Sequence, residues 1–289
     1  MAELKRRVRR ILGSILVYAV LTVPLIPIFL MYTWLFVQAF SDRVIFGIIP
    51  QGLTLRNWAF LNNPIVFGGI THTSIWVILR NTLIFTFGVT GLITVVSSLS
   101  GYALSRVQFK GRTEFMQFIL ALHAFPAVIL LIAVFYILNK MGLYGKGLLA
   151  FLGIIIVKAG MEIPMSAWIL KGFFDVIPWD LEWAALIDGC TRLGTWRRVI
   201  LPMIMPGIAA ISIFSFIAGW GEFILVYTYM ATEEYFTLSV FIHRMIGEIM
   251  YVRWGTIAAL GVFYLLPIIF FFIFTQKALL RIYIGGIKR

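Results

Sequence analysis

Long, uninterrupted runs of apolar residues constrain the fold of this chain more than any other feature of its sequence. Six such runs occur, at about residues 12–38, 81–104, 115–138, 148–170, 203–230 and 256–275. Each is close to the roughly 20 residues that an α-helix needs to cross the hydrocarbon core of a bilayer. Because the runs are continuous and do not alternate with polar residues, they indicate helices and argue against a transmembrane β-barrel. We therefore expect an all-α integral membrane protein with six transmembrane helices.

The composition supports a chain that lies almost wholly in the membrane. Hydrophobic residues make up 61% of the sequence and charged residues 12%, whereas a soluble domain carries roughly 25% charged residues. We expect one transmembrane domain over 1–289, with the core of the domain at about 80–276. Membrane lipid would surround this domain. The apolar run after the basic segment 1–10 is too long for a signal peptide, so we expect it to be a retained first span. The polar segment 41–79 predicts short interfacial helices.

The distribution of lysine and arginine predicts the orientation of the chain in the membrane. With the N-terminus placed in the cytoplasm, the cytoplasmic segments hold 16 of the 24 lysines and arginines. The outer segments then hold seven, and Lys158 lies within a span. Since cytoplasmic loops carry the excess of these residues, we expect both termini in the cytoplasm. We expect the protein itself in the inner, cytoplasmic membrane of the cell. The net charge of +12 is thus a topology signal and does not indicate nucleic-acid binding.

Several motifs of enzymes and metal sites are absent from the sequence. There is no G-x-x-x-x-G-K-[ST] for ATP, no H-E-x-x-H for zinc and no G-x-S-x-G for a nucleophilic serine. The three histidines are scattered, and the single cysteine, Cys190, excludes an internal disulfide. We expect no catalytic residues, no metal site and no cofactor bound by this chain.

The most informative polar stretch is PWDLEWAALIDGCTRLGTWRRVILP, residues 178–202, between the fourth and fifth runs. It predicts a cytoplasmic helix at about 178–193, with Asp180 as a possible N-cap and Gly189 as the stop. Four residues fall at i, i+3, i+4 and i+7 and so share one predicted face: Leu181, Ala184, Ala185 and Asp188. The two small alanines would let another protein approach closely, although the spacing is equally compatible with an ordinary interfacial helix.

The stretch resembles the EAA loop of the permeases of ABC importers. Ala184-Ala185-x-x-Asp188-Gly189, followed after nine residues by Val199-Ile200-Leu201-Pro202, has the spacing of that loop. The similarity is closest to the carbohydrate-uptake, maltose-type branch, and it covers the chain from about residue 53 to residue 288. Other segments that resemble this branch are Asn81-Thr82-Leu83, Gly101-Tyr102-Ala103 with Arg106, Trp220-Gly221-Glu222-Phe223 and Gly285-Gly286-Ile287-Lys288.

The resemblance implies a function and a set of partners. Two permeases would form the path for a sugar, and two cytoplasmic ATPase subunits, which bind ATP and Mg, would drive it. A substrate-binding protein would deliver the sugar from outside. The predicted helix at about 178–193, which we call the coupling helix, would sit in a cleft of one ATPase subunit. The contacts would be made by residues at or near the motif: Glu182, Trp183, Ala184, Ala185, Asp188, Gly189, Leu201 and Pro202.

One position departs from the pattern of the family. The glutamate of the motif is replaced by Trp183, and Glu182 stands one residue earlier. Because consecutive residues are about 100° apart around a helix, Glu182 does not simply replace the lost carboxylate. Either Trp183 meets the cleft of the ATPase by aromatic packing or a cation–π contact, or Glu182 reaches the same partner from another angle. We favour Trp183.

Charged residues within the apolar runs are the candidates for the substrate path. Lys158 and Glu162 are spaced i, i+4 and predict an ion pair, either at a subunit interface or along the path of a sugar. Glu222 and Trp220 form a second candidate, because an aromatic ring and a carboxylate suit a sugar; alternatively, Trp220 belongs to the interfacial aromatic belt.

Other classes of function remain open at this point. A self-sufficient secondary transporter would call for broken helices with coupling ions or internal repeats, and an intramembrane enzyme for paired catalytic residues; neither is visible. Within the importers, the substrate is a sugar, a polyol or a sugar phosphate such as glycerol phosphate. The absence of an arginine cluster within the spans favours a neutral sugar.

Overall fold

The computed structural model describes residues 13–14, 16–45, 49–67, 70–145, 147–247 and 253–284. The basic N-terminal segment 5–10, Lys146 and the tail 285–289 lie outside these residues. The chain forms two compact units. Unit 1 comprises residues 1–63 and 248–265, and unit 2 comprises residues 64–247 and 266–289. Each unit is described separately below.

Unit 1 joins a helix to a short β-hairpin. Its described elements are α2 (Leu25–Phe40), β1 (Ser41–Ile45), β2 (Ile49–Leu53), the 3-10 helix η1 (Arg56–Leu61) and the first part of α13 (Trp254–Ile284). The strands are antiparallel, with Ser41 opposite Leu53. The side chain of Asn57 ties η1 to the junction of α2 and β1, because its Nδ2 lies 3.0 to 3.3 Å from the carbonyl oxygens of Gln38, Ala39 and Ser41.

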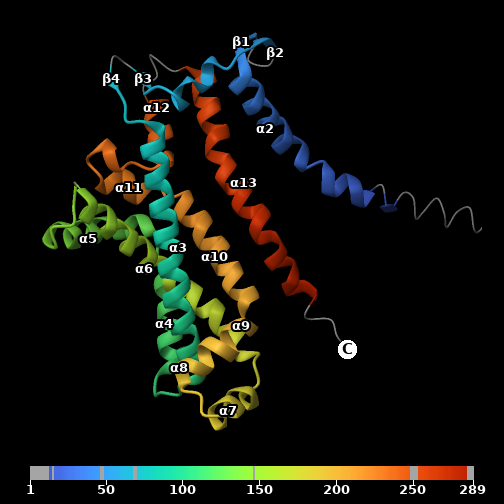
Figure 1. The fold of residues 1–289 in the computed structure, drawn as a ribbon, viewed down its shortest axis with the longest axis vertical. Helices are drawn as coiled ribbons and strands as arrows, with labels where there is room; N and C mark the ends of the chain where they lie inside the picture. Colours follow the sequence, from blue (N-terminus) through green and yellow to red (C-terminus); the bar gives the residue numbers. More distant parts are fainter. Residues whose placement is uncertain are drawn as a thin grey trace, which may run out of the picture. The chain divides into compact units, whose positions relative to one another are not determined.

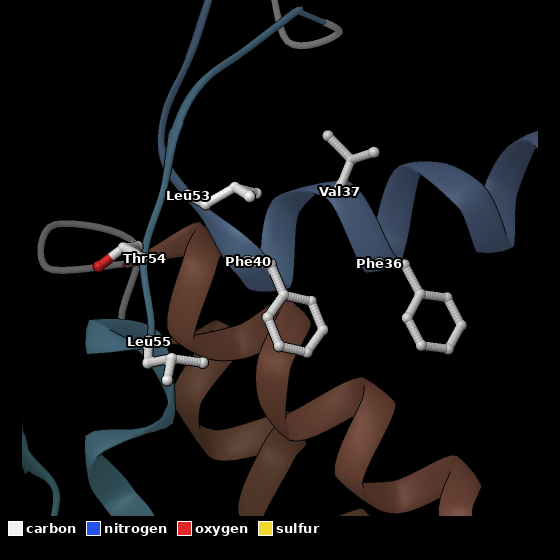
Figure 2. Close-up of a pocket in the computed structure, with 6 residues that line it drawn as sticks. All are labelled: Phe36, Val37, Phe40, Leu53, Thr54 and Leu55. Carbon is white, nitrogen blue, oxygen red and sulfur yellow. The ribbon is translucent and has the colours of Figure 1, made fainter.

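An open pocket of about 560 Å³ lies on unit 1 (Figure 2). Phe36, Val37 and Phe40 of α2 line it together with Leu53, Thr54 and Leu55. Thr54 supplies the only side-chain hydroxyl of this lining. Since a sugar needs several hydrogen-bonding partners, this pocket suits apolar contacts better than carbohydrate.

Unit 2 is built around two long helices, α3 and α6. The described elements are β3 (Val66–Phe67), β4 (Ile70–Thr71), α3 (Ile75–Arg106), α4 (Arg112–His123), α5 (Ala127–Lys140), α6 (Gly147–Asp175), α7 (Trp179–Ile187), α8 (Arg192–Thr195), the π-helical turn η2 (Trp196–Ile200), α9 (Leu201–Met203), α10 (Met205–Trp220), α11 (Ile224–Tyr229), η3 (Glu233–Tyr235), α12 (Leu238–Gly247) and the end of α13. Figure 1 shows α7 near one end of α3 and α12 near the other.

Close packing of α3 against α6 forms the centre of unit 2. Phe85 and Ile93 of α3 lie in one buried cluster with Phe151 and Ile154 of α6. Nearer the end of α3, a Cβ atom on Gly101 would lie 3.0 to 3.1 Å from atoms of α6, two of them backbone atoms. The absence of a side chain at Gly101 is therefore what lets the two helices approach closely here.

The prediction of six transmembrane helices is only partly confirmed. Four helical segments of the described chain are long and apolar enough to cross a membrane: Leu16–Phe40, α3, α6 and Trp254–Gln276. The expected third span is instead a pair, α4 and α5, bent by 97°, and the run before Trp220 is a second pair bent by 80°. Pro126 and Pro206 stand at these bends, where a residue without an N–H interrupts the helical hydrogen bonds. The expected fifth span also ends early, at Trp220.

The prediction of interfacial helices over 41–79 is wrong for most of that segment. Among the described residues of 41–74, only η1 is helical, whereas β1–β2 and β3–β4 form two short antiparallel hairpins. β-Branched residues such as Val44, Ile45 and Ile49 favour extended backbone.

Candidate functional site

The helix predicted in the polar stretch is α7, Trp179–Ile187, followed by a separate short helix α8. The predicted N-cap is wrong: Pro178 precedes the first helical residue, and Asp180 lies in the first turn. There, Asp180 and Glu182 place negative charge near the positive end of the helix dipole. The single helix expected over 178–193 is thus two helices separated by a turn.

The predicted stop at Gly189 is confirmed. Gly189 has φ +88°, a left-handed conformation that glycine adopts without strain. Its N–H donates to the carbonyl of Leu186, and the N–H of Cys190 donates to the carbonyl of Ala185. These two bonds form a Schellman motif, which satisfies the last carbonyls of α7 within the chain itself.

Helix α7 has one buried face and one exposed face. Glu182 is 5% exposed and Ala185 is also buried, so both turn towards the rest of unit 2. The expectation that Ala184 and Ala185 share the free face is wrong, because Ala184 is exposed whereas Ala185 is buried. One residue corresponds to about 100° of rotation, and that rotation separates the two alanines.

The exposed face carries an apolar stripe formed by Trp179, Trp183 and Ile187. These residues are spaced i, i+4 and i+8, which places them along one side of the helix. Trp183 is 55% exposed and Ile187 is 85% exposed, and the rings of Trp179 and Trp183 stack with centroids 6.4 Å apart. Leu181, Ala184 and Asp188 are also exposed. We call Trp179, Trp183 and Ile187 the exposed stripe.

The buried face is fixed to the end of α3 by Glu182. The hydroxyl of Tyr102 donates to Oε1 of Glu182 at 2.5 Å, and Nε of Arg106 lies 2.9 Å from Oε2. Arg106 also donates to the carbonyl of Ile177 at 2.9 Å, and its guanidinium lies 4.5 Å from the centre of the Trp179 ring. The carboxylate of Glu182 is therefore fully engaged within this chain. The sequence resemblance had named Tyr102 and Arg106 but had given them no partner.

The pair Leu201-Pro202 belongs to the short helix α9, directly after the π-helical turn η2. The helical segment 192–203 ends here, and α10 follows at the 80° bend. Pro202 is exposed and Leu201 is half-buried. These two residues therefore lie at the corner that joins the polar stretch to the following apolar helix.

The charged residues of the apolar runs form one cluster, which the sequence analysis had divided into two candidates. Nζ of Lys158 lies 3.0 Å from Oε1 of Glu162 and 2.9 Å from Oε2 of Glu222. Glu222 is buried and its other oxygen accepts the N–H of Leu225 at 2.9 Å, which anchors the start of α11. The side chain of Glu162 is 32% exposed. The i, i+4 pair is confirmed, but the spacing gave no sign of Glu222.

Trp220 does not share the surface of this cluster. It is 1% exposed and stacks on Phe216 with ring centroids 5.8 Å apart. A sugar ring therefore has no access to the Trp220 face in this conformation, and the residue does not stand in an exposed aromatic belt within this chain.

The described residues contain no group of three or more histidine, cysteine, aspartate or glutamate side chains placed to hold a metal ion. His72, for example, pairs with Glu233, its Nδ1 lying 3.2 Å from the carboxylate oxygens.

Comparisons with known proteins point to a transport family. Residues 93–281 match the family model described as "Binding-protein-dependent transport system inner membrane component". The chain is 31% identical over 242 residues to the sulfoquinovosyl glycerol transport system permease protein of Agrobacterium fabrum, covering 83% of this chain and 80% of that protein. It is 28% identical over 279 residues to the trehalose/maltose transport system permease protein of Thermococcus litoralis, covering 95% of this chain and 94% of that protein.

A solved structure supports the fold. The crystal structure of a bacterial ABC transporter involved in the import of the acidic polysaccharide alginate contains a chain that superposes with a TM-score of 0.75. The alignment covers 94% of this chain and 97% of that chain, at 19% sequence identity. At this identity the similarity concerns the fold alone.

Proposed function

Since this chain belongs to the family of binding-protein-dependent transport system inner membrane components, we propose that it is the permease subunit of an ATP-driven importer of a sugar or oligosaccharide. Its place is the inner, cytoplasmic membrane, with both termini and α7 in the cytoplasm. The partners are a second permease, two ATPase subunits that bind ATP and Mg, and an external substrate-binding protein. The names of the two relatives, which concern sulfoquinovosyl glycerol and trehalose or maltose, support the substrate class.

The observation that carries this proposal is the two-faced helix α7. Its inner face is bonded to α3 through Glu182, whereas its outer face presents two tryptophans and an isoleucine to solvent. A contiguous exposed apolar patch marks an interaction site, and tryptophan is enriched among the residues that dominate the energetics of protein interfaces. The exposed stripe therefore suits a cleft in an ATPase subunit, with Trp183 as its central contact.

In this role the chain moves as one of two halves of an alternating pore. ATP binding brings the ATPase subunits together and displaces α7, and the attached transmembrane helices change the side to which the path opens. The cluster of Lys158, Glu162 and Glu222 lies along this path. Ionisable residues within membrane spans are costly and usually functional, and the partly exposed oxygens of Glu162 can accept hydrogen bonds from sugar hydroxyls.

Uptake by the reconstituted complex tests the proposal. Proteoliposomes with both permeases, the ATPase subunits and the binding protein should accumulate radiolabelled maltose or trehalose only with ATP inside. Glycerol 3-phosphate and a polyol such as sorbitol, added in parallel, test the alternative substrates. Uptake by this chain alone, without any ATPase subunit, would show a secondary transporter and contradict the proposal.

A further inference from the structure

Helix α3 differs from every other candidate span in the described part of the chain. It runs for 32 residues from Ile75 to Arg106 without a proline, whereas Leu16–Phe40, α6 and Trp254–Gln276 all contain proline. The remaining two candidates are sharply bent pairs. Because proline removes a helical hydrogen bond and kinks the axis, α3 lacks the interruption that each of the other candidates carries. At 1.5 Å per residue it is about 48 Å long.

The inner end of α3 is joined to α7 by the contacts of Tyr102 and Arg106 with Glu182, which we call the inner latch. All three groups are shielded from solvent or nearly so, with the Arg106 and Glu182 side chains 5% and 7% exposed. The neighbouring Ser105 donates to Oδ1 of Asp175 at 2.6 Å, so the same end of α3 is also bonded to the end of α6. The Arg106–Glu182 contact is a buried ion pair, and separating it would leave unpaired charge away from water, so the joint resists being drawn apart.

The outer end of α3 holds the segment 234–238 in a second set of buried bonds, which we call the outer latch. Nδ2 of Asn81 donates to the carbonyls of Glu234 and Phe236, at 2.6 and 3.3 Å. Oγ1 of Thr82 accepts the N–H of Leu238 at 2.8 Å. Both side chains are buried, and the segment that they hold contains the end of η3 and the start of α12.

We propose that α3 is a rigid connecting rod between α7 and the segment 234–238, with Tyr102 and Arg106 as positioning residues that act through Glu182. This inference rests on the proposed function. A displacement of α7 by an ATPase subunit passes through the inner latch into α3 and emerges at the outer latch, on the side where the binding protein delivers the sugar. Because coupling between sites is reciprocal, docking of the binding protein also acts on the ATPase through the same rod.

A distance measurement on the assembled complex tests the rod directly. One spin label is attached to Cys190, the only cysteine of the chain, next to the end of α7. A second label is attached at Glu234→Cys, an exposed position in the outer segment. Double electron–electron resonance should give one narrow distance that is the same with and without ATP. A distance that changes when ATP is added, in a complex that transports, would overturn the rod.

Variants of the latches test whether the rod couples the two sites. Asn81→Leu should leave basal ATP hydrolysis and ATPase pull-down intact, and for Glu182→Gln the stimulated rate is compared with the basal rate of the same variant. Stimulation of hydrolysis by the binding protein should fall by about 5- to 150-fold, the usual range of coupling between sites. Tyr102→Phe removes a single donor and should give a smaller loss in the same direction.

The matched control is Lys171→Gln. It breaks an ion pair with Asp175 that lies within α6 but keeps the bond from Ser105 to Asp175 and all contacts of Glu182, so stimulation should be unchanged. Normal stimulation and uptake in Glu182→Gln and Asn81→Leu would overturn the proposal. If either variant fails to fold, the distance measurement on the otherwise unaltered complex still decides it. A complex with unaltered latches that showed no ATP-driven uptake would instead refute the proposed function, and this inference with it.

Discussion

At the scale of single residues, neighbouring positions of α7 have opposite surroundings. Glu182 is bonded to Tyr102 and Arg106, and Trp183 is largely exposed. A carboxylate at position 182 is therefore not available to a partner unless the inner latch breaks. In the proposed function, the contact with the ATPase subunit therefore falls to Trp183, which stands where the EAA motif has glutamate.

Replacement of Trp183 by alanine tests that contact. The affinity of the complex for its ATPase subunit should fall roughly 30-fold, which corresponds to about 2 kcal/mol for truncation of a central aromatic residue. The measurement is a quantitative pull-down from detergent solution. Trp76→Ala is the control, because Trp76 has a similar exposure but lies at the other end of α3. Undiminished binding with normal transport would contradict the role of Trp183.

The charge cluster allows function to be separated from stability. Glu162→Gln leaves the Lys158–Glu222 pair in place and changes a partly exposed carboxylate. It should cost less than about 1 kcal/mol of stability, but should raise the KM for sugar uptake if Glu162 lines the path. Glu222→Gln should instead destabilise the protein by about 3–5 kcal/mol, because it disrupts a buried pair. Thermal unfolding in detergent and uptake kinetics distinguish the two, and an unchanged KM in Glu162→Gln would remove Glu162 from the path.

At the scale of elements, the sequence predicted the position of the helices better than their shape or rotation. The apolar runs predict the positions of α3, α6 and the helix that begins at Trp254 well, because a long apolar run can be recognised from the composition of the sequence alone. The bends of 97° and 80° were missed, because proline is tolerated in some membrane helices and breaks others. The rotation of α7 was misjudged because alanine fits either face, and because the partners of Glu182 lie about 80 residues away in the sequence. The contact of Glu222 with Lys158 was missed because these two residues also lie far apart in the sequence.

The C-terminus of α7 offers a test at this scale. Gly189→Ala places a Cβ in the left-handed region at φ +88°, which costs about 1–2 kcal/mol for an L-residue. Hydrogen exchange of the last amides of α7 should accelerate by roughly 5- to 30-fold. The control Gly172→Ala lies within α6 with open space around its Cβ and should not accelerate exchange. Equal protection in Gly189→Ala would contradict the Schellman cap.

At the scale of the whole molecule, the orientation in the membrane decides which partner each end meets. The proposal places α7 in the cytoplasm and the segment around Glu234 outside. The family match and the relatives support a multi-pass membrane protein, and the excess of lysine and arginine supports the orientation.

Labelling from one side of the membrane tests the orientation. A membrane-impermeant maleimide should modify Cys190 in inside-out vesicles of the membrane that holds the protein. It should not modify Cys190 in cells, where the reagent reaches only the outer face of that membrane. With Cys190→Ser and Glu234→Cys combined, the pattern should reverse. Modification of Cys190 from the outside would place the exposed stripe on the wrong side for an ATPase.

The division of α7 into two faces also bears on how such a chain can change over evolutionary time. The inner face contacts residues of the same polypeptide, so a substitution there must be compensated by a second substitution in the same gene. In the proposed complex, the outer face contacts another polypeptide. The Schellman cap ends α7 with backbone hydrogen bonds between residues of the helix and the turn that follows it. Trp183 and Ile187 can therefore vary with the partner while Glu182 and Ala185 stay fixed, whereas Trp179 also contacts Arg106 within this chain. A graft of the exposed stripe alone should be enough to give this permease the ATPase of a relative.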